Sequence, residues 1–307
     1  MPSCAPMAVD QTLLRAWQLP MPDPDSDKEG RGHVLVLGGS REMPGAVILA
    51  ATAALRAGAG KLTIATGRSV AQLVALALPE ARVIGLAETD TGGFTRDAVA
   101  TLDPLADKVS AILIGPGMQD ERATAVLVHA LLPRLAGSDT SVVLDACAMG
   151  AILFPPDGVA PFRFLQPVVL TPHAGEMAHL SGAAKDAIVA DADHHALDAA
   201  ARWNAIVALK GARTVIAAPD GVSWQHAGGN VGLATSGSGD TLAGILAGLA
   251  ARGATLAQAT CWGVALHAQA GTRLARQFGQ LGYLAREIPA EIPFLLEMIA
   301  GRQGSDP

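Results

Sequence analysis

Cysteine is scarce in this chain of 307 residues: the three cysteines, Cys4, Cys147 and Cys261, lie far apart and form no C-x-x-C pair. This spacing excludes a thiolate metal site and is typical of a reducing compartment, where disulfides are rare. The first residues, MPSCAPMAVDQ, lack both the basic segment and the apolar segment of a secretory signal. The sequence therefore predicts a cytoplasmic protein.

Charged and aromatic residues are also few, at 16% and 4% of the chain, and the formal net charge is −6. Proteins that bind nucleic acid usually present a basic face, and those that bind single strands stack bases on aromatic side chains. The composition therefore predicts no nucleic-acid partner.

No apolar run is long enough to cross a membrane. The longest, Ala46–Leu55 and Leu242–Ala251, have ten residues each, whereas a spanning helix needs about twenty. Half of all residues are nevertheless apolar, which is enough to bury a large core and excludes general disorder. We expect both runs to form buried helices and expect no membrane partner.

Short apolar strands alternate with helical segments along most of the chain. The expected strands are His33–Leu37, Lys61–Ala65, Arg82–Leu86, Ala111–Ile114, Ser141–Leu144, Pro167–Leu170, Ala205–Leu209 and Thr214–Ala217. The expected helices are Gly45–Ala57, Val70–Ala77, Arg122–Leu135 and Asp193–Trp203, and the pattern is helical from Gly237 onward. Because many strands are continuously apolar, both of their faces must be covered. The pattern predicts an α/β fold with a mostly parallel central sheet flanked by helices on both faces, a three-layer α/β/α architecture.

The domain organisation follows from composition. Residues 1–31 are expected to form an N-terminal arm, because Leu19–Gly32 is rich in Pro, Asp and Gly. No linker or repeat interrupts residues 32–300, which predicts a single catalytic domain, and residues 301–307 are expected to be a C-terminal tail.

Small and polar residues follow the expected strands. In open parallel sheets, ligands bind outside the carboxyl ends of the strands. Here those ends carry Gly38-Gly39-Ser40, Gly115-Pro116-Gly117, Asp145, Thr171-Pro172-His173 and Lys210-Gly211. The sequence therefore predicts the functional site at this edge.

The segment Ser236–Asp240 comes directly before an apolar helix whose residues Leu242, Ile245 and Leu249 share one face. Glycines at a helix start leave backbone N–H groups open to an anion, and the helix dipole favours negative charge there. Asp240, in the first turn, would then accept a proton from a hydroxyl that attacks phosphorus. The structural alternative is that the glycines only make a turn and Asp240 only favours the dipole. Neither a P-loop motif nor the glycine fingerprint of a dinucleotide site competes with this segment.

The segment Leu209–Gly221 (LKGARTVIAAPDG) is expected to form a strand, a tight turn and a second strand. Lys210, Arg213 and the Thr214 hydroxyl at the turn suit a nucleotide phosphate. A hairpin with solvated cations is the alternative.

The segment Thr171–Leu180 (TPHAGEMAHL) is expected to be a strand end followed by a helix, with Pro172 in the first turn and Glu176 favouring the dipole. A neutral His173 imidazole could hydrogen-bond a substrate, although a lone histidine is more often incidental. The adjacent His194 and His195 indicate a solvated face and no metal site.

Together these segments resemble the ADP-dependent NAD(P)H-hydrate dehydratases of the ribokinase-like superfamily, over about Lys28 to Met298. The resemblance rests on HVLVLGGS, GAVILAATAALRAGAG, ILIGPGM, VVLDA, VLTPHAGEM, LKGARTVIAAPDG and GNVGLATSGSGDTLAGILAGL, in that order. Gly-Ser-Gly-Asp alone indicates only a ribokinase-like protein. The pair TPH-x-GE and GN-x-G-x-AT-x-GSGD is much more specific.

The resemblance implies repair of the S epimer of hydrated NADH or NADPH with ADP, or with ATP in some members. Asp240 would act as the base, and Gly237, Ser238 and Gly239 would form the anion hole. The hydrate would be bound by Ala46, Gly117, His173 and Asp240. AMP or ADP would be bound by Lys210, Gly211, Ala212, Arg213, Thr214 and Gly239. Glu176 would orient Mg²⁺ through water, a separate NAD(P)H-hydrate epimerase would be a functional partner, and the protein would be a homotetramer.

The chain departs from the family pattern at several positions. Cys147 stands where the family usually has aspartate, Met43 where it has Tyr, and Val47 and Ala174 where it has Pro. Two alternatives stay open at this point. One is a ribokinase-like kinase for a hydroxymethylpyrimidine or hydroxyethylthiazole type of substrate, and the other is a nucleotide-binding protein without catalysis.

Overall fold

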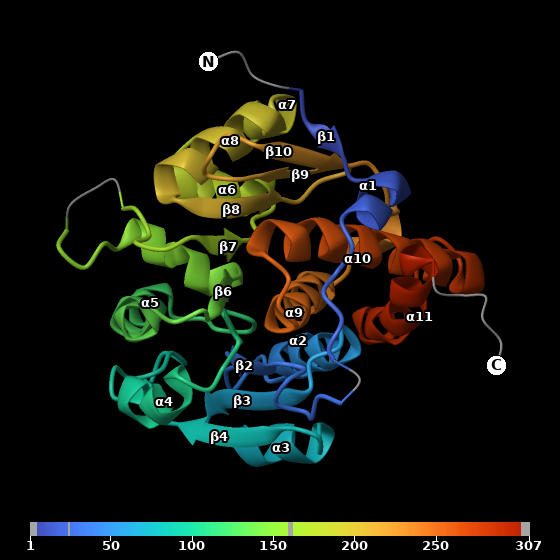
Figure 1. Cartoon of the computed structure of the whole chain (residues 1–307). Coiled ribbons are helices and arrows are strands. Elements are labelled where there is room, and N and C mark those ends of the chain that lie inside the picture. The colour runs from blue at the N-terminus through green and yellow to red at the C-terminus, as the bar shows by residue number, and fades with distance from the viewer. Residues whose placement is uncertain (1–4, 24, 159–161, 302–307) are drawn as a thin grey trace.

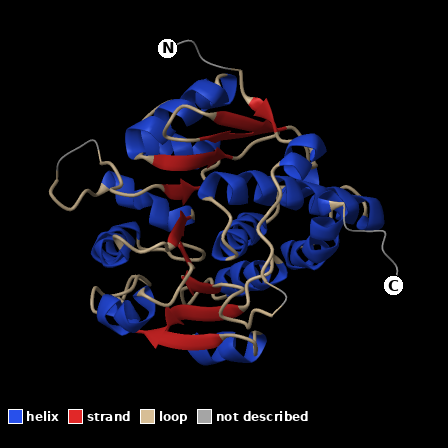
Figure 2. Ribbon diagram, viewed as in Figure 1, coloured by secondary structure: helices blue, strands red, loops and turns tan. Residues whose placement is uncertain are grey.

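The computed structural model describes residues 5–23, 25–158 and 162–301. Figure 1 shows one twisted sheet with helices on both sides, and Figure 2 shows the same view with the strands of the sheet in red and the helices in blue. Cys4 and residues 302–307 of the expected tail lie outside the described residues. Among the described residues, no helix is both long and apolar enough to span a membrane.

The described residues contain a sheet of ten strands in the order β1-β10-β9-β8-β7-β6-β5-β2-β3-β4. From β8 to β4 every neighbouring pair is parallel, whereas β9 runs antiparallel to both β8 and β10. The strands are β1 Met7–Ala8, β2 His33–Leu37, β3 Lys61–Gly67, β4 Arg82–Leu86, β5 Ala111–Ile114, β6 Ser141–Leu144, β7 Val168–Leu170, β8 Ala205–Leu209, β9 Thr214–Ala217 and β10 Ser223–His226. The mostly parallel sheet expected from the sequence is confirmed.

Two buried cores lie on opposite faces of the sheet, and the strands supply alternate residues to them. Val34 and Val36 of β2 belong to one core, and Leu35 and Leu37 to the other. The first core is covered by α1 Gln11–Ala16, α2 Gly45–Arg56, α3 Ala71–Ala77, α9 Ser238–Ala251, α10 Leu256–Phe278 and α11 Ile288–Ala300. The second is covered by α4 Ala98–Ala106, α5 Glu121–Leu135, α6 Ala174–Ser181, α7 Lys185–Ala190 and α8 Ala192–Trp203. This is the expected three-layer α/β/α arrangement (Figure 1).

The N-terminal arm is built into the edge of the sheet. Strand β1 pairs in parallel with β10, and Leu14 of α1 is fully buried. Trp17 stacks on Trp224 with ring centroids 5.9 Å apart. Leu19–Gly32, apart from residue 24, contains no helix or strand, as expected.

Two helices, α2 and α9, lie against each other along glycines. A Cβ added to Gly244 would lie 2.0 Å from the carbonyl oxygen of Ala50, and one added to Gly248 would lie 2.4 Å from that of Ala54. From the first contact to the second, the sequence advances by four residues in both helices, so α2 and α9 run in the same direction. Their N-termini therefore meet at the carboxyl edge of the sheet, with Asp240 one turn before Gly244 and Ala46 one turn before Ala50.

Candidate active site

A cavity of about 850 Å³ opens beyond the carboxyl ends of β6, β7 and β8. The tip of α9 forms one wall of the cavity, and the turn Lys210–Ala212 forms a second. The third wall consists of residues 226–235 and part of α10. This volume lies within the range of small-molecule sites, about 300–1,000 Å³. The site is thus at the edge that the sequence predicts.

The tip of α9 presents free backbone donors to this cavity. Gly237 precedes the helix with φ +87°, a conformation that favours glycine. The Ser238 N–H donates to the Thr235 carbonyl oxygen. In the described part of the chain, the N–H groups of Gly239 and Asp240 have no acceptor. These two groups and the helix dipole make the tip suited to an anion.

Asp240 lies in the first turn of α9, as expected, and its carboxyl group faces the cavity. Its pKa is raised to about 7, chiefly by burial and in addition by the neighbouring Asp145 and Glu176 carboxylates, while Lys210 acts in the opposite direction. A carboxylate with a pKa near 7 is suited to general-base catalysis at neutral pH.

Lys210 stands among the carboxylates of Asp145, Glu176 and Asp240. Its Nζ is 3.7 Å from Asp145 Oδ1 and 3.9 Å from Glu176 Oε2, and a Cβ on Gly239 would lie 3.4 Å from it. The Lys210 side chain is only 22% exposed, so the solvated cation of the alternative interpretation is wrong for this residue. The ammonium group thus lies beside the open amides of α9, where it adds positive charge for a bound phosphate.

His173 caps α6. Its Nδ1 accepts hydrogen bonds from the N–H groups of Gly175 (3.0 Å) and Glu176 (3.1 Å), and the Glu176 carboxylate accepts one from the His173 N–H. Because Nδ1 is an acceptor, the imidazole proton is on Nε2, at the cavity wall. The expectation that Pro172 lies in the first helical turn is wrong. Pro172 precedes the cap, and its carbonyl oxygen accepts a hydrogen bond from the Lys210 N–H instead.

Three of the predicted binding residues do not line the cavity: Ala46, Gly117 and Arg213. Gly117 packs on the first turn of α2, where an added Cβ would lie 2.8 Å from the Ala46 Cβ. Arg213 is 51% exposed and pairs with Asp193 of α8 at 3.3 Å. All the other predicted site residues line the cavity: His173, Glu176, Lys210, Gly211, Ala212, Thr214, Gly237, Ser238, Gly239 and Asp240.

Sequence reasoning assigned no role to Asp145, Asn230 and His267, which also line the cavity. Asp145 is buried and accepts a hydrogen bond from the Thr171 hydroxyl. Its position directly after a strand was the available signal. Asn230 binds the Tyr283 hydroxyl at 3.0 Å, and His267 binds Ser238. Both contacts join segments far apart in the sequence, so no local pattern indicated them.

Cys147 lies away from the cavity. Its Sγ donates to the Thr124 hydroxyl of α5 at 3.6 Å, and burial raises the pKa of the thiol. The side chain at this position therefore packs against the second core and does not line the cavity.

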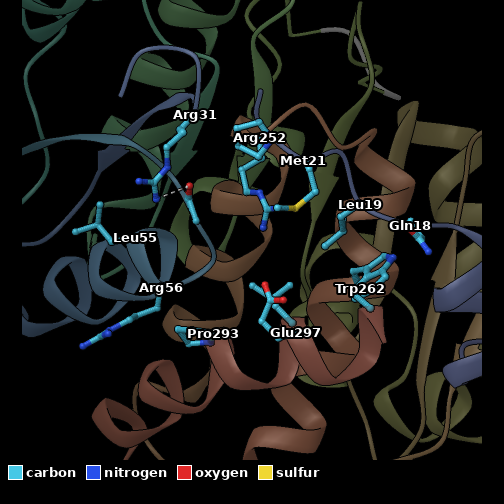
Figure 3. Close-up of a pocket in the computed structure, with 14 residues that line it drawn as sticks. Gln18, Leu19, Met21, Arg31, Leu55, Arg56, Arg252, Trp262, Pro293 and Glu297 are labelled. Carbon is cyan, nitrogen blue, oxygen red and sulfur yellow. Dashed lines mark hydrogen bonds between the residues drawn. The ribbon is translucent and has the colours of Figure 1, made fainter. Parts of the chain in front are cut away.

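A second cavity, of about 450 Å³, lies at the opposite edge of the sheet, where α2 and α9 end (Figure 3). Arg252 lies at its centre and donates to the carbonyl oxygens of Ala57 and Pro20. Arg31 donates to the Gly58 carbonyl oxygen, and Arg56 points away from the centre (Figure 3). Of the three arginines at this second cavity, Arg31 and Arg252 thus hold the arm and the end of α2 in place.

Comparison with known proteins identifies the family. The model of the NAD(P)H-hydrate dehydratase family matches residues 34–294. The chain is 49% identical to an ADP-dependent (S)-NAD(P)H-hydrate dehydratase of Xanthomonas campestris, over 95% of this chain and 96% of the relative. It is 42% identical to a bifunctional NAD(P)H-hydrate repair enzyme Nnr of Moorella thermoacetica, over 92% of this chain but only 53% of that longer protein.

Solved structures agree with this result. The ADP/ATP-dependent NAD(P)H-hydrate dehydratase of Bacillus subtilis, co-crystallised with ATP and Mg²⁺, superposes with a TM-score of 0.79 and 31% identity, over 96% of this chain and 99% of that one. A ribokinase-like superfamily protein of Enterococcus faecalis superposes with a TM-score of 0.78 and 27% identity, over 96% of this chain and 96% of that one. The ribokinase-like fold is therefore confirmed, and the chain belongs to the NAD(P)H-hydrate dehydratase family.

Proposed function

We propose that this protein is an ADP-dependent (S)-NAD(P)H-hydrate dehydratase, a hydro-lyase that restores NADH or NADPH from its hydrate. One observation carries the proposal: the Asp240 carboxyl, with a pKa of about 7, adjoins two open amides and the Lys210 ammonium. A base, an anion site and a cation at one helix tip are what phosphoryl transfer to a hydroxyl requires.

The hydroxyl of the hydrate is a poor leaving group, so it must first be phosphorylated. Asp240 takes the hydroxyl proton while the oxygen attacks the terminal phosphorus of ADP and AMP leaves. The Gly239 and Asp240 amides stabilise the charge on the transferring phosphoryl group. The lone pair of the ring nitrogen then expels phosphate, and a proton leaves the adjacent carbon. The products are NADH or NADPH, AMP and phosphate.

The walls of the cavity indicate how the nucleotide and the hydrate share it. Lys210, Gly211, Ala212 and Thr214 lie on the side where the AMP part of ADP would bind. Arg213 would have to leave its ion pair with Asp193 to reach the nucleotide. The apolar side chains Val231, Leu233, Val264 and Ala268 offer a slot for the adenine. The hydrate would then approach from the N-terminus of α2, where Ala46 and Gly117 lie together.

A magnesium ion would bind chiefly through the phosphates. Among the described residues, no cluster of three or more His, Cys, Asp or Glu side chains could hold a metal by itself. Mg²⁺ keeps several waters and needs only one or two carboxylates besides phosphate oxygens. The Glu176 carboxylate at the cavity wall suits this role through water. When bound, the ion would neutralise phosphate charge.

A single assay separates the proposal from its alternatives. The protein is incubated with each epimer of hydrated NADH and with ADP or ATP, and the absorbance of restored NADH is followed. We expect recovery with the S epimer. A kinase would convert a pyrimidine or thiazole alcohol and restore no NADH, and a non-catalytic protein would bind ADP alone. Absence of NADH with both epimers and both nucleotides would reject the proposal.

The acid limb of the pH profile should report Asp240. The base must be deprotonated, so kcat/KM is expected to fall below pH 7, by about tenfold per pH unit. Asp145 is one of the two negative charges that raise this pKa. Asp145→Asn should therefore move the acid limb to lower pH in a steady-state profile. An acid limb at the same pH in Asp145→Asn and wild type would mean that a group other than Asp240 causes the fall in kcat/KM.

His173→Ala is expected to weaken hydrate binding more than ADP binding, measured as the two KM values. Alanine also removes the cap of α6, which typically costs about 1 kcal/mol of stability. His173→Asn is the matched control, because asparagine caps helices but has no imidazole. We expect both variants to lose hydrate affinity and only the alanine variant to melt at a lower temperature. Equal changes in the two KM values would show that the hydrate does not bind at His173.

The partners of the reaction follow from its chemistry. An epimerase must convert the R hydrate to the S form, and we propose that it is a functional partner. The bifunctional Nnr relatives, of which this chain spans about half, support this link. We propose a homotetramer located in the cytoplasm, which size-exclusion chromatography with light scattering and cell fractionation would test.

A further inference from the structure

A histidine of α10, His267, lies against the helix tip that binds the anion. Its Nε2 is 3.0 Å from the Ser238 hydroxyl oxygen and 3.1 Å from the Ser238 carbonyl oxygen. The residue lies on the wall of the large cavity and is only partly exposed. The mechanism above gives it no role.

The contact with the carbonyl oxygen fixes the protonation of the ring. Nitrogen and oxygen lone pairs would repel each other at 3.1 Å, so a hydrogen must lie between them and Nε2 must donate. Burial and the Lys210 charge lower the pKa of His267 to about 4, so the ring is a neutral donor at physiological pH. The Ser238 carbonyl oxygen also accepts from the Thr241 hydroxyl at 2.7 Å.

Two side-chain donors therefore hold one peptide group, the one between Ser238 and Gly239. A peptide group is planar and trans, so its C=O and its N–H point in opposite directions. When the Ser238 carbonyl is held by His267 and Thr241, the Gly239 N–H is aimed the other way, out of the helix tip. That N–H has no acceptor in the described part of the chain and lies beside Lys210.

We propose that His267 is a positioning residue: it holds the Ser238–Gly239 peptide so that the Gly239 amide points at the phosphoryl group during transfer. The inference rests on the proposed function for the identity of the reaction. The effect of such a contact is largest in the transition state, where charge on the phosphoryl oxygens must be met by donors that are already oriented.

The test compares His267→Leu, which removes the donor, with His267→Gln, which keeps an N–H donor on a side chain of similar reach. We expect His267→Leu to lower kcat about 10- to 100-fold, less than the loss of an anion-hole donor itself. The KM for ADP should stay close to that of the wild type. His267→Gln should recover most of kcat. A residue that only fills the core would give the opposite order, because leucine fits an apolar site better.

Thr241→Val provides a second route to the same carbonyl if His267→Leu fails to fold. It should lower kcat by a smaller factor. The double variant of Thr241→Val with His267→Leu should show non-additive losses, because both side chains act on one peptide group. Additive losses would overturn the proposal.

Binding of AMP with aluminium fluoride, which mimics a transferring phosphoryl group, tests the proposal without dehydration. Calorimetry should show weaker binding of this complex to His267→Leu than to wild type, recovery in His267→Gln, and equal affinities for ADP. If the wild type restores no NADH but this pattern appears, the proposed function fails and the role of His267 stands. If the wild type restores NADH and His267→Leu matches it in kcat and in binding, the role of His267 is overturned.

Discussion

Asp240→Asn is expected to abolish NADH recovery while ADP still binds. Asparagine keeps the size of the side chain and the backbone N–H groups of the helix tip, but it cannot accept the hydroxyl proton. Loss of a general base typically lowers kcat by about 10²–10⁴-fold. Rates with the S hydrate and ADP, measured beside ADP affinity by calorimetry, check this directly. Retained turnover would show that the base is another group.

The Asp240→Asn variant should also fold well, which separates loss of chemistry from loss of structure. The pKa of Asp240 is raised in the folded state, from the ordinary 3.8 to about 7. The ionised carboxylate therefore destabilises the fold. This effect is absent below pH 3.8, where the carboxyl is protonated in both states, and is complete above pH 7. At pH 8 the asparagine variant is expected to melt no lower than the wild type. Asp198→Asn, at an exposed position of α8, is the control for the substitution itself.

The parallel core of the fold was predictable because its strands and helices are continuous apolar segments. Continuous apolar strands must be covered on both faces, and the expected strands from His33–Leu37 to Thr214–Ala217 match β2 to β9 to within two residues at each end. Residues 1–31 were expected to form an arm and were assigned no helix or strand, yet Met7–Ala8 forms a strand and Gln11–Ala16 a helix. These elements are too short to show a periodicity, and their pairing with β10 depends on a strand more than 200 residues away.

The candidate site was predictable to the extent that it consists of strand ends and one helix tip. Asp240 and Lys210 belong to local patterns, and both line the cavity. His173 shows the limit: the sequence indicated an imidazole near a strand end with Pro172 already in the helix, and only the structure shows that Nδ1 of His173 caps that helix. His267 is 29 residues from Ser238 along the chain and lies inside an amphipathic helix, where nothing local distinguishes it from a core residue.

Gly244→Ala is expected to destabilise the fold and to impair catalysis. The added Cβ would lie 2.0 Å from the Ala50 carbonyl oxygen, which is helix backbone and has no rotamer to change. Overpacking typically costs about 1–3 kcal/mol, and we expect a loss at the upper end of this range. The better helix propensity of alanine offsets only about 1 kcal/mol. Thermal unfolding should show a lower melting temperature.

The same substitution reaches the site, because Asp240 lies one turn before Gly244 on α9. A separation of the two helices would move the base away from the hydrate, and a misplacement of about 1 Å can lower a rate about 100-fold. Gly45→Ala is the stability control, since no atom lies within 4 Å of its added Cβ and it should melt like the wild type. A Gly244→Ala variant with unchanged melting temperature and kcat would show that the helices can separate freely, and that their close contact does not position the base.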